Sequence, residues 1–469
     1  MSDIDANKKK ETHPMLILLV VVILCAIATY IIPAGTYNTT LDEEIGSEII
    51  DVSSFKFIHR TPADFGDLCM SFTLGLQNAS ALIFFLLIIG GMFGIVNGTG
   101  ALNLSLANIM KKIKGREYLM IPIIMLLLGC GSTFCGNFEE FLVFVPLILA
   151  CCITAGYDSL TAVGIIFFAA SAGYGGGITN AFTVGKAQEI AGLPTFSGMS
   201  LRITLFLTLE AISFLYVIWY AHMIKKNPKL SGAYIYDQEY NQNKNLNLNN
   251  IPALSVRQAA VILVFIVGMV LAAIGVVIEG YYVDELSAIF LVVGGLCGLL
   301  GKLSPSEICK KFVRGSRDML LPCFMIGLAN GAVILLQDAN VLDTVLHYAS
   351  ELLALLPSYL MAWGMFIFHL LFNVIVPSGS VQATATMPVM VPLADSAGIT
   401  RQTAVLAYQL GDAFTNVLAP TGGEILAALA ICRVPFGKWV RFLLPLFLMW
   451  VIIAFIFLIY AVNIGYGPF

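Results

Sequence analysis

The chain has 469 residues, of which 58% are hydrophobic and only 12% charged, and its formal net charge at pH 7 is -4. With a mean hydropathy of +0.88, this composition lies far outside the range of soluble globular proteins and excludes that class. It indicates a helical protein that crosses a lipid bilayer several times. Because the chain has no surplus of basic residues, we expect no nucleic-acid partner.

Apolar runs of roughly 17 to 25 residues, each long enough to cross a hydrocarbon core of ~30 Å, recur along the chain. They begin near Pro14, Ala79, Ser159, Leu201, Gln258, Asp284, Met319, Thr400 and Phe436. The first run follows Lys8, Lys9 and Lys10 and lacks a small-residue cleavage site. We therefore expect an uncleaved first helix rather than a signal peptide.

Lys and Arg residues cluster in five stretches that the positive-inside rule assigns to the cytoplasm. The stretches are 8–10, 111–116, 225–229, 302–317 and 433–441. The loop 33–78 is rich in Asp and Glu instead, so we expect it outside. A single crossing by 118–154 would put 225–229 on the wrong side, whereas a re-entrant hairpin at 118–154 removes the conflict. The N-terminus is predicted to be cytoplasmic.

The turn of this hairpin falls in GCGSTFCGNFEEF (129–141), where Glu139 and Glu140 stand between two apolar runs. A carboxylate at mid-membrane costs at least ~2.5 kcal/mol and is a functional hypothesis by default. Two adjacent carboxylates do not both ionise readily in a low dielectric unless a cation lies beside them. We expect one to contact a substrate ammonium or guanidinium and the other to couple a proton or Na⁺. The alternative is that one caps the second limb of the hairpin.

Comparison of the chain with itself indicates two homologous halves. Identities recur in order at an offset of 240 to 242 residues, from Phe72, Gly75 and Gly91, which match Phe312, Gly315 and Gly331, to Thr161, which matches Thr403. The charge-based topology puts the two copies on opposite sides, so the repeat is inverted. The predicted parts are a cytoplasmic tail (1–13), the first repeat (14–224), a cytoplasmic linker (225–257) and the second repeat (258–469).

The repeat predicts a second hairpin at 359–395, which enters from outside and turns within FNVIVPSGSVQAT (372–384). After each hairpin comes a helix interrupted by small and polar residues, at 159–190 and 400–426. Three glycines at 175–177 cost about 1 kcal/mol each relative to alanine, and Pro420 removes a ladder donor. The expected fold is all-α, with about nine spanning helices and two opposed re-entrant hairpins.

Broken helices expose carbonyl groups that coordinate a cation and N-termini that hold an anionic group. The alternative is that the small residues merely allow close helix packing. The candidate substrate-binding residues are Ser132, Thr133, Asn137, Glu139, Glu140, Asn180, Thr183, Asn373, Ser378, Gly379, Ser380, Gln382, Asp412, Asn416 and Thr421. The candidate ion-coupling residues are Glu139, Glu140, Thr179, Asn180, Asp412, Thr415 and Asn416.

Glu210 lies within an apolar helix and has two interpretations, a proton path or a hydrogen bond between helices. No metal-ligand spacing of His, Cys and carboxylates and no nucleophile motif is present in the sequence. We therefore expect no enzyme activity, no bound metal and no cofactor, other than Na⁺ or H⁺ as a coupling ion.

Seven stretches carry a resemblance to a known family. They are IIPAGTY (31–37), FEEF (138–141), GYDS (156–159), NAFTVGKAQEIAGLP (180–194), PSGSVQATATMPVMVPLAD (377–395), GDAFTNVLAPTGG (411–423) and RVPFGKW (433–439). In this order the chain resembles the YfcC-type carriers of the C4-dicarboxylate anaerobic carrier family. That family is similar in architecture to the aminobenzoyl-glutamate transporters, in the same ion-transporter superfamily. Ala181 departs from the family pattern N-P-F-T-V-G, which has proline there.

The resemblance implies a multi-pass protein of the bacterial cytoplasmic membrane that forms a homodimer. It also implies an elevator-type motion, in which the hairpins, the broken helices and the helix after each move as a transport domain against a scaffold. Members look like carriers of basic amino acids, of dicarboxylates or of other amino-acid-like solutes.

We predict a secondary active transporter for a small zwitterionic or basic amino-acid-type solute, working by ion-coupled symport or exchange. The acidic tip favours this substrate, because Glu139 and Glu140 would repel a dianion unless they were protonated or bound to a cation. A C4-dicarboxylate carrier is the first alternative. An ion channel is an alternative of another class, and two opposed hairpins suit alternating access better than a continuous pore.

Overall fold

The computed structural model describes residues 14–42, 47–102, 104–105, 108, 117–136, 138–242, 254–275, 279, 281 and 283–467. The predicted tail, 1–13, and part of the predicted linker lie outside these residues. Seven of the described helices are long and apolar enough to cross a membrane: Ser80–Gly98, Glu117–Phe134, Ser159–Ile190, Met199–Lys226, Leu320–Asp338, Ser358–Ile375 and Phe436–Asn463. A largely helical protein with several candidate spans is confirmed, and the count of about nine stays a prediction.

One segment contradicts the expectation of an all-α chain. β1 (Gly35–Asp42) and β2 (Ser47–Phe57) form a two-stranded antiparallel sheet in which Gly35 lies opposite Phe57. The strands are rich in Thr, Ile and Val, which favour extended backbone. The sheet is attached to α16 (Leu342–Ala354), since the backbone N–H of Tyr37 donates to Asp343 at 3.3 Å and the Phe55 ring stacks on His347.

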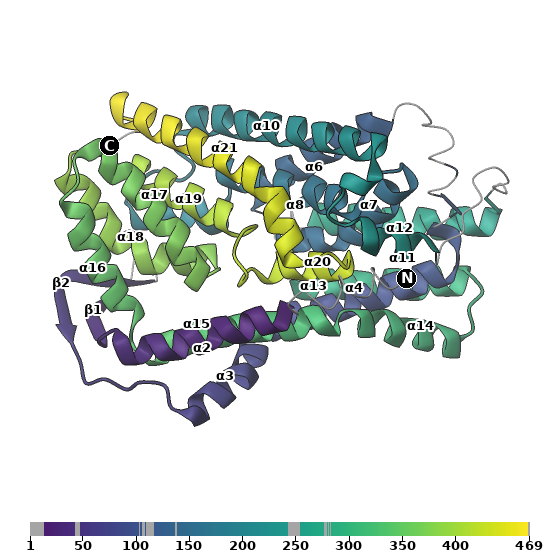
Figure 1. The fold of residues 1–469 in the computed structure, drawn as a ribbon, viewed down its shortest axis with the longest axis horizontal. Helices are drawn as coiled ribbons and strands as arrows, with labels where there is room; N and C mark the ends of the chain where they lie inside the picture. The colour runs from purple at the N-terminus through teal and green to yellow at the C-terminus, as the bar shows by residue number, and fades with distance from the viewer. Residues whose placement is uncertain are drawn as a thin grey trace.

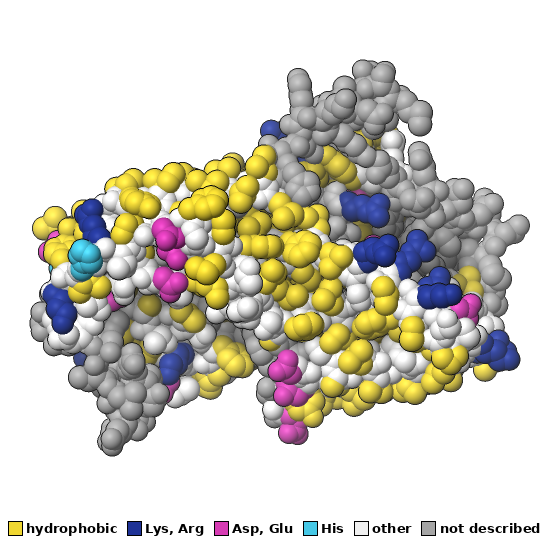
Figure 2. Space-filling model, turned by 90° about the horizontal axis from the view of Figure 1, so that it is seen from below, with side chains coloured by type: hydrophobic (Ala, Val, Ile, Leu, Met, Phe, Trp, Pro, Cys, Tyr) yellow, Lys and Arg dark blue, Asp and Glu magenta, His cyan; other side chains and the backbone are white. Residues whose placement is uncertain are grey.

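Six helices form one layer of the molecule, called here the lower layer (Figure 1). They are α2 (Pro14–Ile31), α3 (Phe65–Asn78), α4 (Ser80–Gly98), α13 (Val283–Leu300), α14 (Pro305–Asp318) and α15 (Leu320–Asp338). A further helix, α12 (Val256–Ile274), packs on α13. Figure 2 shows hydrophobic side chains spread over this face, with a group of Lys and Arg side chains at the end where α14 lies. The side of the membrane that each end faces stays a prediction.

Pairs of helices in the lower layer share their lengths across the two halves. α3 and α14 each have 14 residues, and α4 and α15 each have 19. The starts of each pair are 240 residues apart (305 − 65 and 320 − 80). Packing is reciprocal as well, because Gly75 of α3 lies against the backbone of α15 and Gly315 of α14 lies against that of α4. A Cβ at either glycine would overlap a carbonyl oxygen, that of Gly327 or that of Gly90. These agreements support the inverted repeat, which stays a prediction together with its bounds.

A second group of helices surrounds two of its own members, which are buried along almost their whole length. The members of this group from the first half are α6 (Met120–Cys135), η2 (Glu139–Phe144), α7 (Val145–Thr154), α8 (Ser159–Gly176), η3 (Ala181–Gly185), α9 (Lys186–Ile190) and α10 (Met199–Lys226). In the second half they are α17 (Ser358–Ile375), α18 (Gly379–Ser396), α19 (Arg401–Thr415), α20 (Gly423–Ile431) and α21 (Phe436–Asn463). Every residue of α8, and every residue of α19 after Arg401, is buried. These two helices form the centre of the core.

Part of the predicted linker is firmly docked. After η4 (Pro228–Leu230), helix α11 (Tyr234–Gln242) places Asp237 at the start of α8, where its carboxylate accepts hydrogen bonds from the N–H and hydroxyl of Ser159. The neighbouring Asp158 accepts from Tyr220 at 2.8 Å and from Ser231 at 2.6 Å. Both carboxylates are buried, so the linker is held to α8 and α10 by an acidic cluster.

This cluster predicts pH-dependent docking of α11. Burial raises the pKa of the Asp237 carboxyl from 3.8 to about 7; the nearby Asp158 carboxylate acts in the same direction, and the hydrogen bonds from Ser159 oppose both. Because the docked form binds the proton more tightly, docking is strongest at low pH and weakens as the pH rises from about 4 to about 7. Hydrogen exchange of 234–242, corrected for intrinsic rates, should show protection falling about tenfold or more over that window.

In Asp237→Asn the protection of α11 should no longer depend on pH in this range. The matched control is Asp318→Asn at the exposed end of α14, which should behave as the wild type does. An Asp237→Asn variant with wild-type pH dependence would assign the effect to another group.

Candidate substrate site between the hairpin tips

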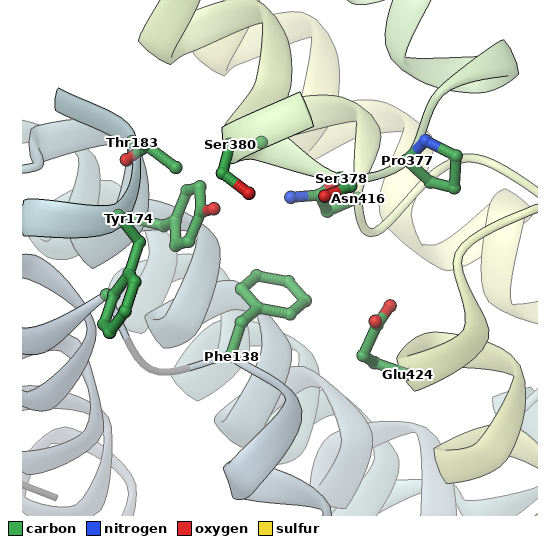
Figure 3. Close-up of a pocket in the computed structure, with 11 residues that line it drawn as sticks. Phe138, Tyr174, Thr183, Pro377, Ser378, Ser380, Asn416 and Glu424 are labelled. Atoms are coloured by element: carbon green, nitrogen blue, oxygen red, sulfur yellow. The ribbon is translucent and has the colours of Figure 1, made fainter. Parts of the chain in front are cut away.

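A cavity of about 310 Å³ lies where the two hairpin tips and the two helix breaks meet (Figure 3). It is lined by Gly136, Phe138, Tyr174, Phe182, Thr183, Pro377, Ser378, Gly379, Ser380, Asn416 and Glu424. The volume is at the lower end of the range for small-molecule sites, ~300 to 1,000 Å³. Chain segments from both halves therefore converge on one space of the size of a small solute.

The first hairpin tip is tied to the first break by hydrogen bonds between threonine hydroxyls and the backbone. Gly136 follows α6 as its C-cap, with a φ of +77° that favours glycine, and Gly177 follows α8 as its C-cap, with a φ of +49°. Beyond Gly177, the N–H of Ile178 donates to the hydroxyl of Thr133 at 3.2 Å, and the Thr179 hydroxyl donates to the carbonyl of Phe134 at 2.9 Å. The break is thus satisfied by the last turn of α6.

Asn180 restarts the helix after this break. Its side-chain Oδ1 accepts from the N–H groups of Phe182 at 3.0 Å and Thr183 at 3.2 Å, so it acts as an N-cap. Ala181 then occupies the first helical position, the place where proline is most easily accommodated. A Cβ on Gly136 would lie 2.5 Å from Asn180 Oδ1, which shows how closely the tip approaches the break.

The second break follows the same construction. Asn373 of α17 donates from Nδ2 to the Asp412 carbonyl at 2.9 Å and to Asn416 Oδ1 at 2.7 Å. Thr415 and Thr421 donate to carbonyls of α17, those of Leu370 at 2.9 Å and Val374 at 2.7 Å. The first limb of the second hairpin therefore supplies the partners that the interrupted helix lacks.

Gly379 at the second tip marks the point where the halves touch. A Cβ there would lie 2.5 Å from Asp412 Oδ2, 2.6 Å from Thr183 Cγ2 and 2.8 Å from the Tyr174 hydroxyl oxygen. Tyr408 donates to the Gly379 carbonyl at 2.7 Å, and Gln409 donates to the Tyr174 carbonyl at 2.6 Å. Asp412, which is fully buried, therefore stands directly behind the cavity wall.

The structure divides the predicted site residues into three groups. Thr183, Ser378, Gly379, Ser380 and Asn416 line the cavity. The lining does not include Ser132, Thr133, Thr179, Asn180, Asn373, Gln382, Asp412, Thr415 and Thr421, all of which are buried except Thr179, which is partly exposed. Several of these bond backbone carbonyls, as Ser132 does to Ala170 at 2.8 Å and Gln382 to His369 at 2.9 Å. Asn137 and the side chains of Glu139 and Glu140 lie outside the described part of the chain, and their roles stay predictions.

Glu424 was not among the predicted residues, yet its carboxylate lines the cavity in the first turn of α20 (Figure 3). The sequence interpretation ended the broken helix at 426 and placed Glu424 near its end. In the structure α20 continues to Ile431, so Glu424 stands at the start of a new helix beside the break. A carboxylate directly after Gly422 and Gly423 was the available signal. The aromatic lining by Phe138, Tyr174 and Phe182 carried no distinctive pattern.

Comparisons with known proteins match nearly the whole chain. The model of the C4-dicarboxylate anaerobic carrier family matches residues 12–463. The Escherichia coli K12 protein named "Putative basic amino acid antiporter YfcC" is 31% identical over 464 residues, covering 91% of this chain and 91% of that protein. An uncharacterized Haemophilus influenzae protein is 30% identical over 507 residues, covering 98% and 99%. These matches confirm the resemblance seen in the sequence.

Two solved transporters align over almost the full length. The Alcanivorax borkumensis YdaH transporter has a TM-score of 0.42 at 16% identity, covering 97% of this chain and all of that one (100%). Neisseria gonorrhoeae MtrF, described as one of a class of antimetabolite efflux pumps, has a TM-score of 0.39 at 14% identity, covering 98% of this chain and 97% of that one. At such scores neither structure bears on the geometry described above.

Replacing Asn373 with alanine should destabilise the protein by about 1 to 3 kcal/mol, because the Asp412 carbonyl and Asn416 amide lose a buried donor. Thermal unfolding of the purified protein in detergent measures the effect. Thr384→Ala, at a partly exposed position of α18 with a hydrogen bond only within its own helix, is the matched control. Equal melting of the two variants would mean that the Asn373 bonds do not hold the second break.

Proposed function

Because this chain belongs to the C4-dicarboxylate anaerobic carrier family, a family of membrane transporters, we propose that it is a secondary active transporter of a small amino-acid-type solute, zwitterionic or basic. It works by ion-coupled symport or by exchange in the bacterial cytoplasmic membrane. The observation that carries the proposal is the cavity between the two tips, which offers chemically different groups to the two ends of such a solute.

One end of the cavity suits a carboxylate. Ser378 is the N-cap of α18, and Gly379 and Ser380 begin its first turn. All three residues line the cavity, so the N-terminus of α18 and two hydroxyl groups belong to its wall. The N-terminus of a helix of 18 residues attracts negative charge. Asn416 adds an amide beside them. A substrate carboxylate therefore binds at the second tip in this proposal.

The other end of the cavity suits a cation. Glu424 lines it from α20, and the predicted partners Glu139 and Glu140 belong to the adjoining η2. A carboxylate forms its strongest hydrogen bonds with charged donors such as ammonium and guanidinium groups. Phe138, between the two ends in Figure 3, offers an aromatic face to the aliphatic part of a solute. This arrangement favours a zwitterion or a basic amino acid.

A C4-dicarboxylate carrier is the second candidate, because the family description names that substrate. Its second carboxylate would meet Glu424, so it would need a bound cation or a proton there. The name of the Escherichia coli relative, a putative basic amino acid antiporter, favours the first candidate. Alternating access of the same cavity serves both.

In the proposed cycle the two hairpin tips close the cavity from opposite sides, and a transport domain moves against a scaffold within a homodimer. The hairpins, the broken helices, α10 and α21 form the transport domain, and the lower layer belongs to the scaffold. The carbonyl and side-chain oxygens around Thr179, Asn180, Thr415, Asn416 and Asp412 are the proposed positions for Na⁺; protonation of Glu139 or Glu140 is the alternative coupling.

The proposal predicts which ligands stabilise the protein. In a thermal-shift screen of the purified chain, L-arginine or L-lysine should raise the melting temperature, because ligand that binds the folded state shifts unfolding. Succinate and fumarate should have no effect at the same concentration. Each ligand is tested with and without Na⁺ and at two pH values. Stabilisation by the dicarboxylates alone would overturn the substrate class and favour the second candidate.

Glu424→Gln should weaken binding of L-arginine by about tenfold or more, since a charge-assisted hydrogen bond contributes about 1.5 to 3 kcal/mol. Isothermal titration calorimetry measures this effect. Glu351→Gln, the same change at a side chain that is 63% exposed, should leave the affinity unchanged. Undiminished binding in Glu424→Gln would contradict the role of Glu424 and assign the cationic group of the solute to Glu139 or Glu140 of the first tip.

A further inference from the structure

Glu210 is a second buried carboxyl group that the proposed site does not use. It lies in the middle of α10, is only 2% exposed, and neither carboxyl oxygen has a hydrogen-bond partner. None of the salt bridges within the described ranges includes it. On the same helix Phe206, Ser213 and Val217, which lie one or two turns away on the same side, are buried as well, so Glu210 lies on the inner face of α10.

The surroundings of Glu210 are apolar and tightly packed. A Cβ on Gly129 of α6 would lie 3.0 Å from Glu210 Oε2, and the Phe206 ring would be 3.2 Å from the same position. Gly173 of α8 is pressed against the Gly129 carbonyl, and Gly176 against Phe206. The carboxyl is therefore enclosed at the point where α6, α8 and α10 cross.

The helices around Glu210 carry several other ionisable groups. The Cys130 thiol of α6 interacts electrostatically with it. The others on α6, α8, α10 and α21, in the described part of the chain, are Tyr174, Arg202, Tyr216, Tyr220, His222, Lys225, Lys226, Lys438, Arg441 and Tyr460. Among these, Tyr174 lines the cavity, Tyr216 donates to the Phe442 carbonyl, and Tyr220 donates to Asp158. Arg202 is eight residues away, about 12 Å along the helix at 1.5 Å per residue.

An ionised carboxylate without a partner in such a place costs several kcal/mol, so the carboxyl is neutral in this arrangement. A protonated carboxyl with unmade hydrogen bonds still costs about 1 to 3 kcal/mol, which a leucine would not. A merely structural role therefore does not account for the residue. The helix-to-helix hydrogen bond considered from the sequence is not made by either oxygen.

α6 connects Glu210 to the cavity. It packs on Glu210 at Gly129 and ends seven residues later at Gly136, in the cavity lining. Any rearrangement that shifts α6 relative to α10 changes the enclosure of the carboxyl. Exposure to water favours the ionised form, and renewed enclosure favours the protonated form.

We propose that Glu210 is a proton-binding site that takes up and releases one proton in each transport cycle as the first hairpin moves, so that transport is coupled to H⁺. The inference rests on the transport function proposed above and names its coupling ion. The carboxylate takes H⁺ from water on one side, becomes a neutral carboxylic acid while enclosed, and returns H⁺ to water on the other side. No other bond is made or broken.

Two measurements on the full-length protein test this site. Infrared difference spectra of the wild type between about pH 5 and pH 9, the range in which buried Glu residues titrate, should show a protonated carboxyl band that disappears at high pH. Asp237, whose pKa is raised to about 7, titrates in the same range and contributes a carboxyl band to the wild type and to both variants. The part of the band that is due to Glu210 should be absent in Glu210→Gln and present in the control Glu189→Gln, whose side chain is 44% exposed. Identical titrating bands in the wild type and Glu210→Gln, or a Glu210 part that does not titrate, would overturn the proposal.

The second measurement is uptake of L-arginine into proteoliposomes with a pH gradient in either direction. Reversing the gradient should change wild-type and Glu189→Gln uptake about tenfold or more, as expected for a ligand that shifts a two-state equilibrium by ~1.4 kcal/mol. Glu210→Gln should be insensitive to the gradient while it still exchanges arginine for arginine. Wild-type sensitivity in Glu210→Gln would overturn the proposal.

The two proposals fail in different ways. If the wild type neither binds nor transports L-arginine or L-lysine, the proposed solute is wrong, and the infrared titration still decides the proton site. If Glu210→Gln does not fold, Glu210→Asp replaces it. Its titrating band should then move to a different frequency, and a band left unchanged by Glu210→Asp would overturn the assignment.

Discussion

The structure depends on one constraint: backbone groups that leave a helix at membrane depth must find partners within the protein. Two helices, α8 with α9 and α19 with α20, are interrupted in the core, and each is repaired by the first limb of its own hairpin. Thr133 and Phe134 of α6 serve the break after Gly177, and Leu370, Asn373 and Val374 of α17 serve the break after Thr415. A broken helix and its limb are therefore one unit, because separating them would leave buried donors and acceptors unpaired.

This pairing restricts what can move. The first limb of each hairpin is bonded to the buried core. The first tip, at Gly136, packs against Asn180 of its own half, whereas the second tip, at Gly379, packs against Tyr174 and Thr183 of the opposite half. Tyr408 donates to the Gly379 carbonyl and so bonds the second tip to α19, and Gln409 donates to the Tyr174 carbonyl and so joins the two central helices, α19 and α8. In the proposed cycle, access to the cavity changes either by movement of a tip or by movement of the whole bonded unit. Both fit a carrier better than a continuous pore.

Much of this arrangement follows from the sequence because it depends on backbone chemistry. Glycines at 175–177 and Pro420 predict both breaks, and the repeat, at an offset of 240 to 242 residues, predicts the second turn within 372–384. Orientation of individual side chains did not follow. Ser132 and Gln382 donate to backbone carbonyls in this structure, and their roles as ligands stay predictions. Glu424 lies at the start of α20, which extends to Ile431, beyond the predicted end at 426. The sheet of β1 and β2 depends on Thr, Ile and Val in a loop whose acidic charge is its more conspicuous feature.

Buried carboxyl groups in this chain differ in how well they are satisfied, and the difference separates structure from function. Asp158 accepts hydrogen bonds from the backbone N–H and hydroxyl of Thr161 and from the hydroxyls of Tyr220 and Ser231. Both of its oxygens therefore have donors, as expected of a carboxyl group with a structural role. Glu210 is equally enclosed and has none of these donors. Such a carboxyl group is ionised in an arrangement that exposes it to water and protonated in one that encloses it, so its protonation changes with the arrangement. Incomplete satisfaction therefore costs stability in this conformation, and it is the property that a proton carrier requires.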